Sequence, residues 1–261
     1  MTTPNLNKPR GLYLLMFGSE IYSKRFWEVD FVRGIALIMM LISNFVTDLQ
    51  FFLGYSEYRV FWKLFAYATA SLFVSISGLS LWISHARGKK TLKKYFLRFA
   101  KLFGLGLLIT LTTYLLLERG TIYFGVLHFL GVASLLVIPF YPLGWKNIFP
   151  AVLFLLGGQI VKNVHADTLL FLPLGITPHE FFTLDYFPIF PWFGVFLLGT
   201  AIGALIYPDG KRKFKISTPK NPLLEFVCFM GRNTLKIYFI HQPVFVGLLM
   251  LLYGGLPNLG V

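Results

Sequence analysis

The sequence predicts an all-α, polytopic integral membrane protein, a helical bundle of about seven transmembrane helices with short interfacial helices beside it. Of its 261 residues, 56% are hydrophobic and only 13% are charged, and the mean hydropathy is +0.68. These values exclude an ordinary soluble domain. A bilayer core of about 30 Å needs about 20 helical residues, and apolar runs of that order recur along the chain.

Seven segments are expected to cross the membrane, and short polar or basic loops separate them. In chain order they are Phe31–Leu53, Val60–Ser84, Tyr95–Leu117, Ile122–Tyr141, Ile148–Val161, Phe187–Tyr207 and Asn233–Tyr253. The fifth is short and contains Pro150, so its assignment rests on the charge pattern. The sixth has Gly199 and Gly203 one turn apart, which predicts close packing with a neighbouring helix. Tyr13–Phe17 and Pro222–Met230 are too short to cross and are expected at the interface.

The basic residues predict the orientation of the bundle. If the N-terminal segment is cytoplasmic, seven crossings leave the Arg87–Lys101 and Lys211–Lys220 clusters on the same side, as the positive-inside rule requires. Without the fifth span the Lys211–Lys220 cluster would lie outside. Orientation therefore explains the net charge of +13 without nucleic acid. We expect a multi-pass protein of the cell membrane with a cytoplasmic or interfacial segment 1–25, one transmembrane domain 26–253 and a short external tail 254–261.

Several polar side chains lie inside these apolar segments, where they are costly and therefore indicate a functional site. Asn44 and Asp48 share one face in the outer half of the first span. His128 lies at a comparable depth in the fourth span, and His241, beside Gln242, lies nearer the midplane of the last. If these helices adjoin, the side chains line one cavity. The alternative is that they form only interhelical hydrogen bonds.

A histidine near a carboxylate is the arrangement that general-base catalysis needs. We therefore expect His128 to act as base or nucleophile and Asp48 to orient it or stabilise its charge. A neutral histidine that bridges two helices is the alternative for His128.

Basic residues at the cytoplasmic edge suggest an anion site. Arg33 lies three residues after Asp30 and just inside the hydrocarbon, where its guanidinium needs an acceptor. The other basic positions expected there are Lys94, Arg98 and Lys101 before the third span and Arg232 and Lys236 before the last. Of these, Arg33, Arg98, Lys101 and Arg232 are predicted to bind the phosphates of a nucleotide-bearing cofactor. Anionic lipid headgroups, or orientation alone, explain the same residues.

The loop Lys162–Tyr186 contains histidines and carboxylates but predicts no metal site. Their spacing matches no recognised metal-binding pattern, so a solvated loop is the preferred interpretation. The residues concerned are His165, Asp167, His179, Glu180 and Asp185.

Three stretches resemble the family built around the catalytic domain of heparan-alpha-glucosaminide N-acetyltransferase, and in particular its small prokaryotic members. They are RFWEVDFVRGIALIMM from Arg25, YFGVLHFLGV from Tyr123 and GRNTLKIYFIHQP from Gly231. The resemblance extends from Arg25 to about Pro243, and the first motif is the most specific of the three.

The resemblance implies a membrane enzyme that takes acetyl from cytosolic acetyl-CoA, as co-substrate, and delivers it to an amino sugar across the membrane. Asn44 matches an asparagine of the animal enzyme, and His128 matches the histidine of a prokaryotic Gly-Val-Leu-His pattern. The animal enzyme's catalytic histidine lies just beyond the first helix. Here Gly54–Tyr58 contains none, so either His128 or His241 replaces the base, with Asn44 as a polar donor to the acyl oxygen, or the protein keeps only a binding role.

The expected function is therefore acetyl-CoA-dependent acyl transfer, either directly or through an acetyl-histidine. The expected partners are membrane lipids, a small-molecule acyl donor and a glycan-type acceptor, with homo-oligomerisation left open. The alternative is a non-enzymatic transporter or channel in which the same polar groups line a path. A third interpretation is a lipid-binding or assembly partner.

Overall fold

The structure is a computed structural model that describes residues 25–88, 91–217 and 221–254, and in these the chain forms helices and no strand. The prediction of an all-α protein is confirmed. Most of segment 1–25, the tail 255–261 and the expected interfacial segment Tyr13–Phe17 lie outside these residues. The helices are α3 (Trp27–Leu53), α4 (Arg59–Arg87), α5 (Leu92–Leu116), α6 (Val126–Leu136), α7 (Ile148–Val161), α8 (Ile189–Ile206), α9 (Pro222–Arg232) and α10 (Thr234–Tyr253), with 3-10 segments η1 (Ile138–Asn147), η2 (Leu169–Leu174) and η3 (Pro208–Gly210).

Six stretches of the described residues are long and apolar enough to cross a membrane. They are α3, α4, α5, the continuous stretch of η1 and α7, α8 and α10. The fourth predicted span differs in length, because its helix α6 begins only at Val126 and has 11 residues. The sequence expectation of about seven helices thus corresponds to six long stretches and this shorter helix.

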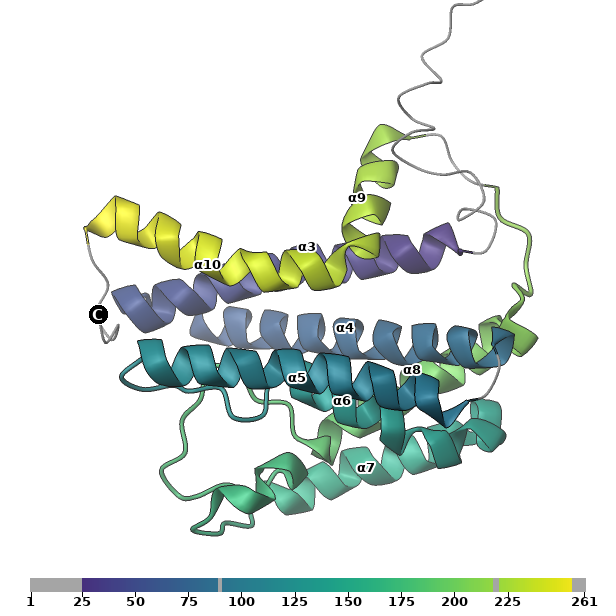
Figure 1. Ribbon diagram of the computed structural model, residues 1–261, viewed down its shortest axis with the longest axis horizontal. Coiled ribbons are helices and arrows are strands. Elements are labelled where there is room, and N and C mark those ends of the chain that lie inside the picture. The colour runs from purple at the N-terminus through teal and green to yellow at the C-terminus, as the bar shows by residue number, and fades with distance from the viewer. Residues whose placement is uncertain (1–24, 89–90, 218–220, 255–261) are drawn as a thin grey trace, which may run out of the picture.

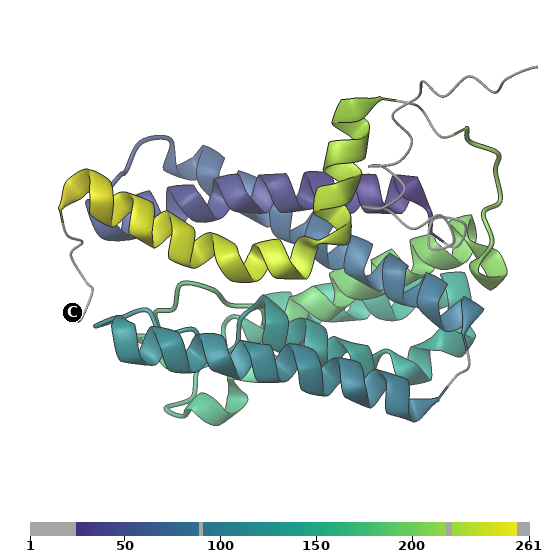
Figure 2. The ribbon, with the colours of Figure 1, turned by 45° about the horizontal axis from the view of Figure 1, so that its top comes forward.

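The helices pack around α4 and α8, which lie together through most of their length (Figure 1). On one side α4 contacts α3, which also contacts α9 and α10; on the other side α8 contacts α7, and α5 pairs with α6. Figure 2 shows that α9 lies across α3 and not along it. The centre of the bundle is fully buried and rich in aromatic residues, with Phe129, Phe193 and Phe196 at its core.

Small residues bring the central helices close together, as the sequence predicted for Gly199 and Gly203. A Cβ at Gly199 would collide with the backbone of Ser75, and one at Gly203 would touch Trp82. Gly78 of α4 lies equally close to the backbone of Phe196. Close backbone approach of this kind is a common way for helices to associate in lipid.

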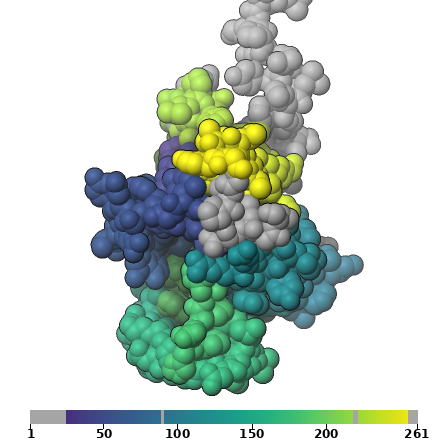
Figure 3. Space-filling view, turned by 90° about the vertical axis from the view of Figure 1, so that its left-hand side faces the viewer, coloured from purple at the N-terminus to yellow at the C-terminus, as the bar shows by residue number. Residues whose placement is uncertain are grey.

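Figure 3 faces the end of the molecule where α3 finishes and α4 begins, which we name the outer end. Two segments, 120–124 and 184–187, pair with each other between the helices. Leu184 N–H donates to the Gly120 carbonyl at 3.2 Å, and Phe187 N–H donates to the Phe124 carbonyl at 2.9 Å. This pairing explains why α6 begins deep in the bundle and is short.

Candidate functional site

The α3–α10 contact brings together four of the residues that the sequence singled out. Asn44 Nδ2 lies 2.9 Å from His241 Nε2, and Gln242 Nε2 donates to Asp48 Oδ1 at 2.7 Å. Asn44 and Asp48 are one helical turn apart on α3, whereas their partners His241 and Gln242 are consecutive residues of α10, so the two pairs lie close together along the α3–α10 contact. The sequence led us to expect the first, fourth and last spans side by side; the structure places the first and last in contact through these polar residues, whereas α6 of the fourth span is not among the main contacts of either.

The hydrogen bonds of His241 define which of its nitrogens is basic. Nδ1 lies 2.5 Å from the Tyr238 carbonyl oxygen, which can only accept, so Nδ1 carries the proton. Nε2 then has the free lone pair and accepts a hydrogen bond from the Asn44 amide. His241 is 7% exposed, so its imidazole is held in one orientation by groups on both sides.

Asp48 is 4% exposed, and its Oδ2 has no hydrogen-bond partner among the described residues. A shielded carboxylate oxygen of this kind needs a proton or a cationic group to compensate it. Its position one turn from Asn44 puts this acidic group beside the His241 pair.

His128 does not make the predicted contact with Asp48. Its Nδ1 accepts from Gly125 N–H at 3.3 Å, and Thr110 Oγ1 lies 3.4 Å from its Nε2. The ring, in a side chain that is 2% exposed, stands edge-on to Phe103 and stacks on Phe124. The cause is the late start of α6, which puts His128 in the first turn, where it caps the Gly125 backbone and faces α5.

A cavity of about 530 Å³ lies among α3, α4, α5, α6 and α10 towards the opposite, inner end of the bundle. Three of the four predicted phosphate-binding residues line it: Arg33, Arg98 and Lys101. Lys94 also lines it, and no carboxylate does. Arg232 is not in its lining but lies near enough to Asp30 to interact with it electrostatically.

Arg33 and Arg98 differ in how far the protein satisfies them. Arg33 forms an ion pair with Asp30 at 2.9 Å and donates to Ser80 Oγ at 2.5 Å. Arg98 Nε is shielded from solvent and has no hydrogen-bond partner in the described part of the chain. A buried guanidinium N–H without an acceptor is the feature expected where an anionic ligand completes the site.

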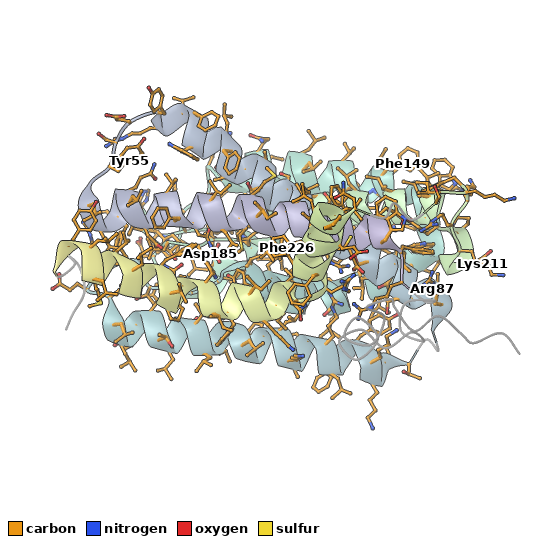
Figure 4. The ribbon with its side chains drawn as sticks, turned by 90° about the horizontal axis from the view of Figure 1, so that it is seen from above. Tyr55, Arg87, Phe149, Asp185, Lys211 and Phe226 are labelled. Atoms are coloured by element: carbon orange, nitrogen blue, oxygen red, sulfur yellow. The ribbon has the colours of Figure 1, made fainter. Side chains whose placement is uncertain are left out.

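Tyr238 connects the inner cavity to the α3–α10 pairs. Its side chain lines the cavity, and its carbonyl holds the His241 ring one turn further along α10. The same tyrosine interacts electrostatically with Asp185, and Figure 4 shows Asp185 between α3 and α10 in projection. Tyr238 therefore contacts both regions, but His241, Asn44 and Asp48 do not themselves line this cavity, so the cavity differs from the common one that the sequence led us to expect.

Sequence reasoning missed Asp185, Tyr238 and Ser80. Asp185 was assigned to a solvated loop, but its Oδ2 accepts from Val126 N–H at 3.0 Å and a Cβ at Gly125 would collide with it. The other four acidic and histidine positions of that loop, His165, Asp167, His179 and Glu180, are exposed as expected. No three histidine, cysteine or carboxylate residues gather into a metal-like group within the described ranges.

A family model described as "Heparan-alpha-glucosaminide N-acetyltransferase, catalytic" matches residues 25–243. The chain belongs to this family. No curated protein and no solved structure matches it significantly. The match spans α3 to the middle of α10 and therefore includes both the inner cavity and the Asn44–His241 pair.

Membership in the heparan-alpha-glucosaminide N-acetyltransferase family, together with the long apolar helices, identifies a multi-pass membrane protein of a transferase type. The family resemblance stated from three sequence motifs is confirmed over the same residues.

Proposed function

We propose that the protein is a transferase of the cell membrane that moves acetyl from cytosolic acetyl-CoA to an amino group of a glycan-type acceptor on the other side. Its N-terminus would be cytoplasmic. The observation that supports this best is the connection, through Tyr238, between a cavity lined by four basic side chains and a histidine with a defined basic nitrogen. An anionic donor and a proton-losing acceptor require these two environments side by side.

The inner cavity suits the phosphate-rich end of CoA. Lys94, Arg98 and Lys101 come from consecutive turns of one face of α5 and carry positive charge into a space without carboxylates. Arg33 adds a guanidinium that Asp30 and Ser80 hold in place. The partnerless Nε of Arg98 is the donor that a phosphate oxygen would satisfy.

The chemistry we propose at the α3–α10 pairs is direct transfer with His241 as general base. The acceptor amine attacks the acetyl carbon, the new N–C bond forms as the C–S bond breaks, and His241 Nε2 takes the amine proton. That proton then goes to the thiolate, so the products are the N-acetyl acceptor and CoA thiol. Asn44, released from Nε2, donates its N–H to the acyl oxygen. Asp48, through Gln242, would hold α10 in register.

The decisive experiment compares two matched histidine variants of the full chain in lipid nanodiscs. His241→Asn keeps an N–H for the Tyr238 carbonyl but lacks the basic Nε2, whereas His128→Asn keeps an acceptor for Gly125 N–H. With radiolabelled acetyl-CoA and a glucosamine-terminated oligosaccharide, His241→Asn should lose activity by about 100-fold or more. His128→Asn should keep most of it. The opposite pattern would restore His128 as the base and overturn our assignment.

Cofactor binding is measured separately from turnover. CoA should raise the melting temperature of the wild-type protein, because a ligand that prefers the native state stabilises it. Arg98→Gln should abolish this shift. The control is Arg119→Gln, which lies in the connection between α5 and α6 at the outer end and should retain it. If CoA stabilises neither the wild type nor Arg119→Gln, the donor assignment is wrong, and a solute path through the polar centre becomes the better explanation.

A further inference from the structure

A second cavity, of about 400 Å³, lies at the outer end between the last turns of α3 and the first turns of α4. Thr47 and Gln50 line it from α3, Tyr55 from the connection, and Arg59, Trp62 and Lys63 from α4. Figure 4 shows Tyr55 at this connection, beside the start of α4 and well away from the inner end. Its volume is within the range of small-molecule sites, about 300–1,000 Å³.

The charge of this outer cavity is one-sided. Arg59 and Lys63 line it, and no carboxylate does. Within the described residues neither cation forms a salt bridge, since the ion pairs there join Arg33 to Asp30 and Arg212 to Glu28. Their positive charge is therefore compensated only by solvent or by a ligand.

The uncharged groups around the cavity also include hydrogen-bond donors without acceptors. Trp62 Nε1 is shielded from solvent and has no acceptor among the described residues. The first turn of α4 contains no acidic residue, and its N-cap, Tyr58, makes no side-chain hydrogen bond to it. A tryptophan N–H can only donate, so the missing partner must be an acceptor. Cations, a buried donor and an uncapped helix start favour the same kind of ligand.

We propose that the outer cavity binds the phosphate of an anionic headgroup, supplied by a phospholipid or by a phosphate-linked glycan at the outer membrane surface. The two cations lie at the start of a transmembrane helix, at the depth where headgroup phosphates are found. The cavity has room for the phosphate and part of the polyol or sugar attached to it. This site is separate from the inner cavity and does not rest on the acetyl-transfer chemistry.

The test measures the thermal stability of the full chain in phosphatidylcholine nanodiscs, with and without phosphatidylglycerol. Phosphatidylglycerol should stabilise the wild type, and the double variant Arg59→Gln/Lys63→Gln should bind it about tenfold more weakly. The matched control is Lys162→Gln, an exposed cation that follows α7 and is absent from the cavity lining. Trp62→Phe keeps the aromatic packing but removes the donor, so it should show a smaller loss in the same direction.

A second arm separates the two sources of phosphate. Soluble glucose 1-phosphate is added to the phosphatidylcholine nanodiscs, and stabilisation that depends on Arg59 and Lys63 would identify a phosphosugar ligand. Stabilisation by phosphatidylglycerol alone would identify a lipid headgroup. Either result supports the site. An equal response of wild type, double variant and Lys162→Gln, or no response to either anion, would overturn the proposal.

Discussion

The two buried histidines of the bundle show how a neighbouring backbone group decides what an imidazole can do. The Tyr238 carbonyl fixes the proton of His241 on Nδ1, so its Nε2 is basic and faces the Asn44 amide. The Gly125 N–H instead occupies Nδ1 of His128, and aromatic rings enclose that side chain. In the sequence, both histidines lie within apolar segments and are candidates for a base. Only the identity of the backbone partner distinguishes a candidate base from a capping group.

Asp185 leads to a prediction about pH. Burial raises the pKa of this carboxyl group from its ordinary value of about 4 to about 6, although the hydrogen bond from Val126 N–H opposes the shift. The folded protein then holds the proton more tightly than the unfolded chain, so Asp185 lowers stability progressively as pH rises through the window from about 4 to about 6. The melting temperature of the wild type should fall across this window.

Asp185→Asn is the matched variant, because its amide oxygen can still accept from Val126 N–H but cannot ionise. Thermal unfolding in detergent, followed by circular dichroism at a series of pH values, should give a flatter profile for Asp185→Asn than for the wild type. Parallel profiles would mean that Asp185 does not have the raised pKa.

At the scale of elements, the crossing of α3 and α9 depends on two glycines. A Cβ at Gly34 would collide with the Val227 backbone, and one at Gly231 would collide with the Asp30 backbone. These contacts place α9 across α3 next to the Arg33–Asp30 ion pair, and Arg33 Nη1 also lies 3.5 Å from the Gly231 carbonyl. The inner wall of the basic cavity is therefore coupled to the position of α9.

We predict that Gly231→Ala destabilises the protein by about 1–3 kcal/mol, the usual range for overpacking of a tight contact. Gly247→Ala is the control, since nothing lies within 4 Å of a Cβ at that position of α10. It should be neutral or slightly stabilising, because alanine favours a helix interior over glycine. Unfolding by graded addition of sodium dodecyl sulfate measures both variants, and similar losses for the two would contradict the close-contact explanation.

At the scale of the whole molecule, the inner end is basic and the outer end is fastened by loops. The inner end carries the basic clusters around Lys94 and Arg212. The paired segments 120–124 and 184–187 and the connection between α7 and α8 lie towards the outer end. From the positive-inside rule we propose that the inner end faces the cytoplasm. This orientation determines which cavity meets which compartment.

Cysteine labelling tests that orientation. Cys228 is the chain's single cysteine, and its Sγ lies 3.4 Å from the Trp27 carbonyl oxygen, so Cys228→Ser gives a suitable background. In intact cells, single cysteines that replace Lys93 or Lys213 should react with an impermeant maleimide only after the membrane is permeabilised. Cysteines replacing Glu57 or Lys162 should react with an impermeant maleimide from outside. The reverse pattern would invert the bundle and the assignment of both cavities.

Apolar length and charge predicted most of the fold, because both reflect the thickness and asymmetry of the bilayer. They identified five of the six long stretches and the α7 part of the other, Ile138–Val161, and the polar positions on α3 and α10 do meet. They failed at α6, because hydropathy cannot tell a full span from a short helix preceded by extended segments. The error in the partner of His128 follows from this. Asp185 was missed because its burial depends on pairing between segments that are about 60 residues apart in the chain.

Two side-chain hydrogen-bonded pairs join α3 to α10, and under the proposed mechanism acceptor binding opens only one of them. An amine that approaches Nε2 of His241 must take the place of the Asn44 amide, while the Asp48–Gln242 bond, a turn away, stays intact. In the resting protein the lone pair of the base is therefore occupied, and a water molecule would have to compete for it in the same way. Under the proposed mechanism this arrangement limits hydrolysis of the thioester when no acceptor is bound, and it does so without a moving lid.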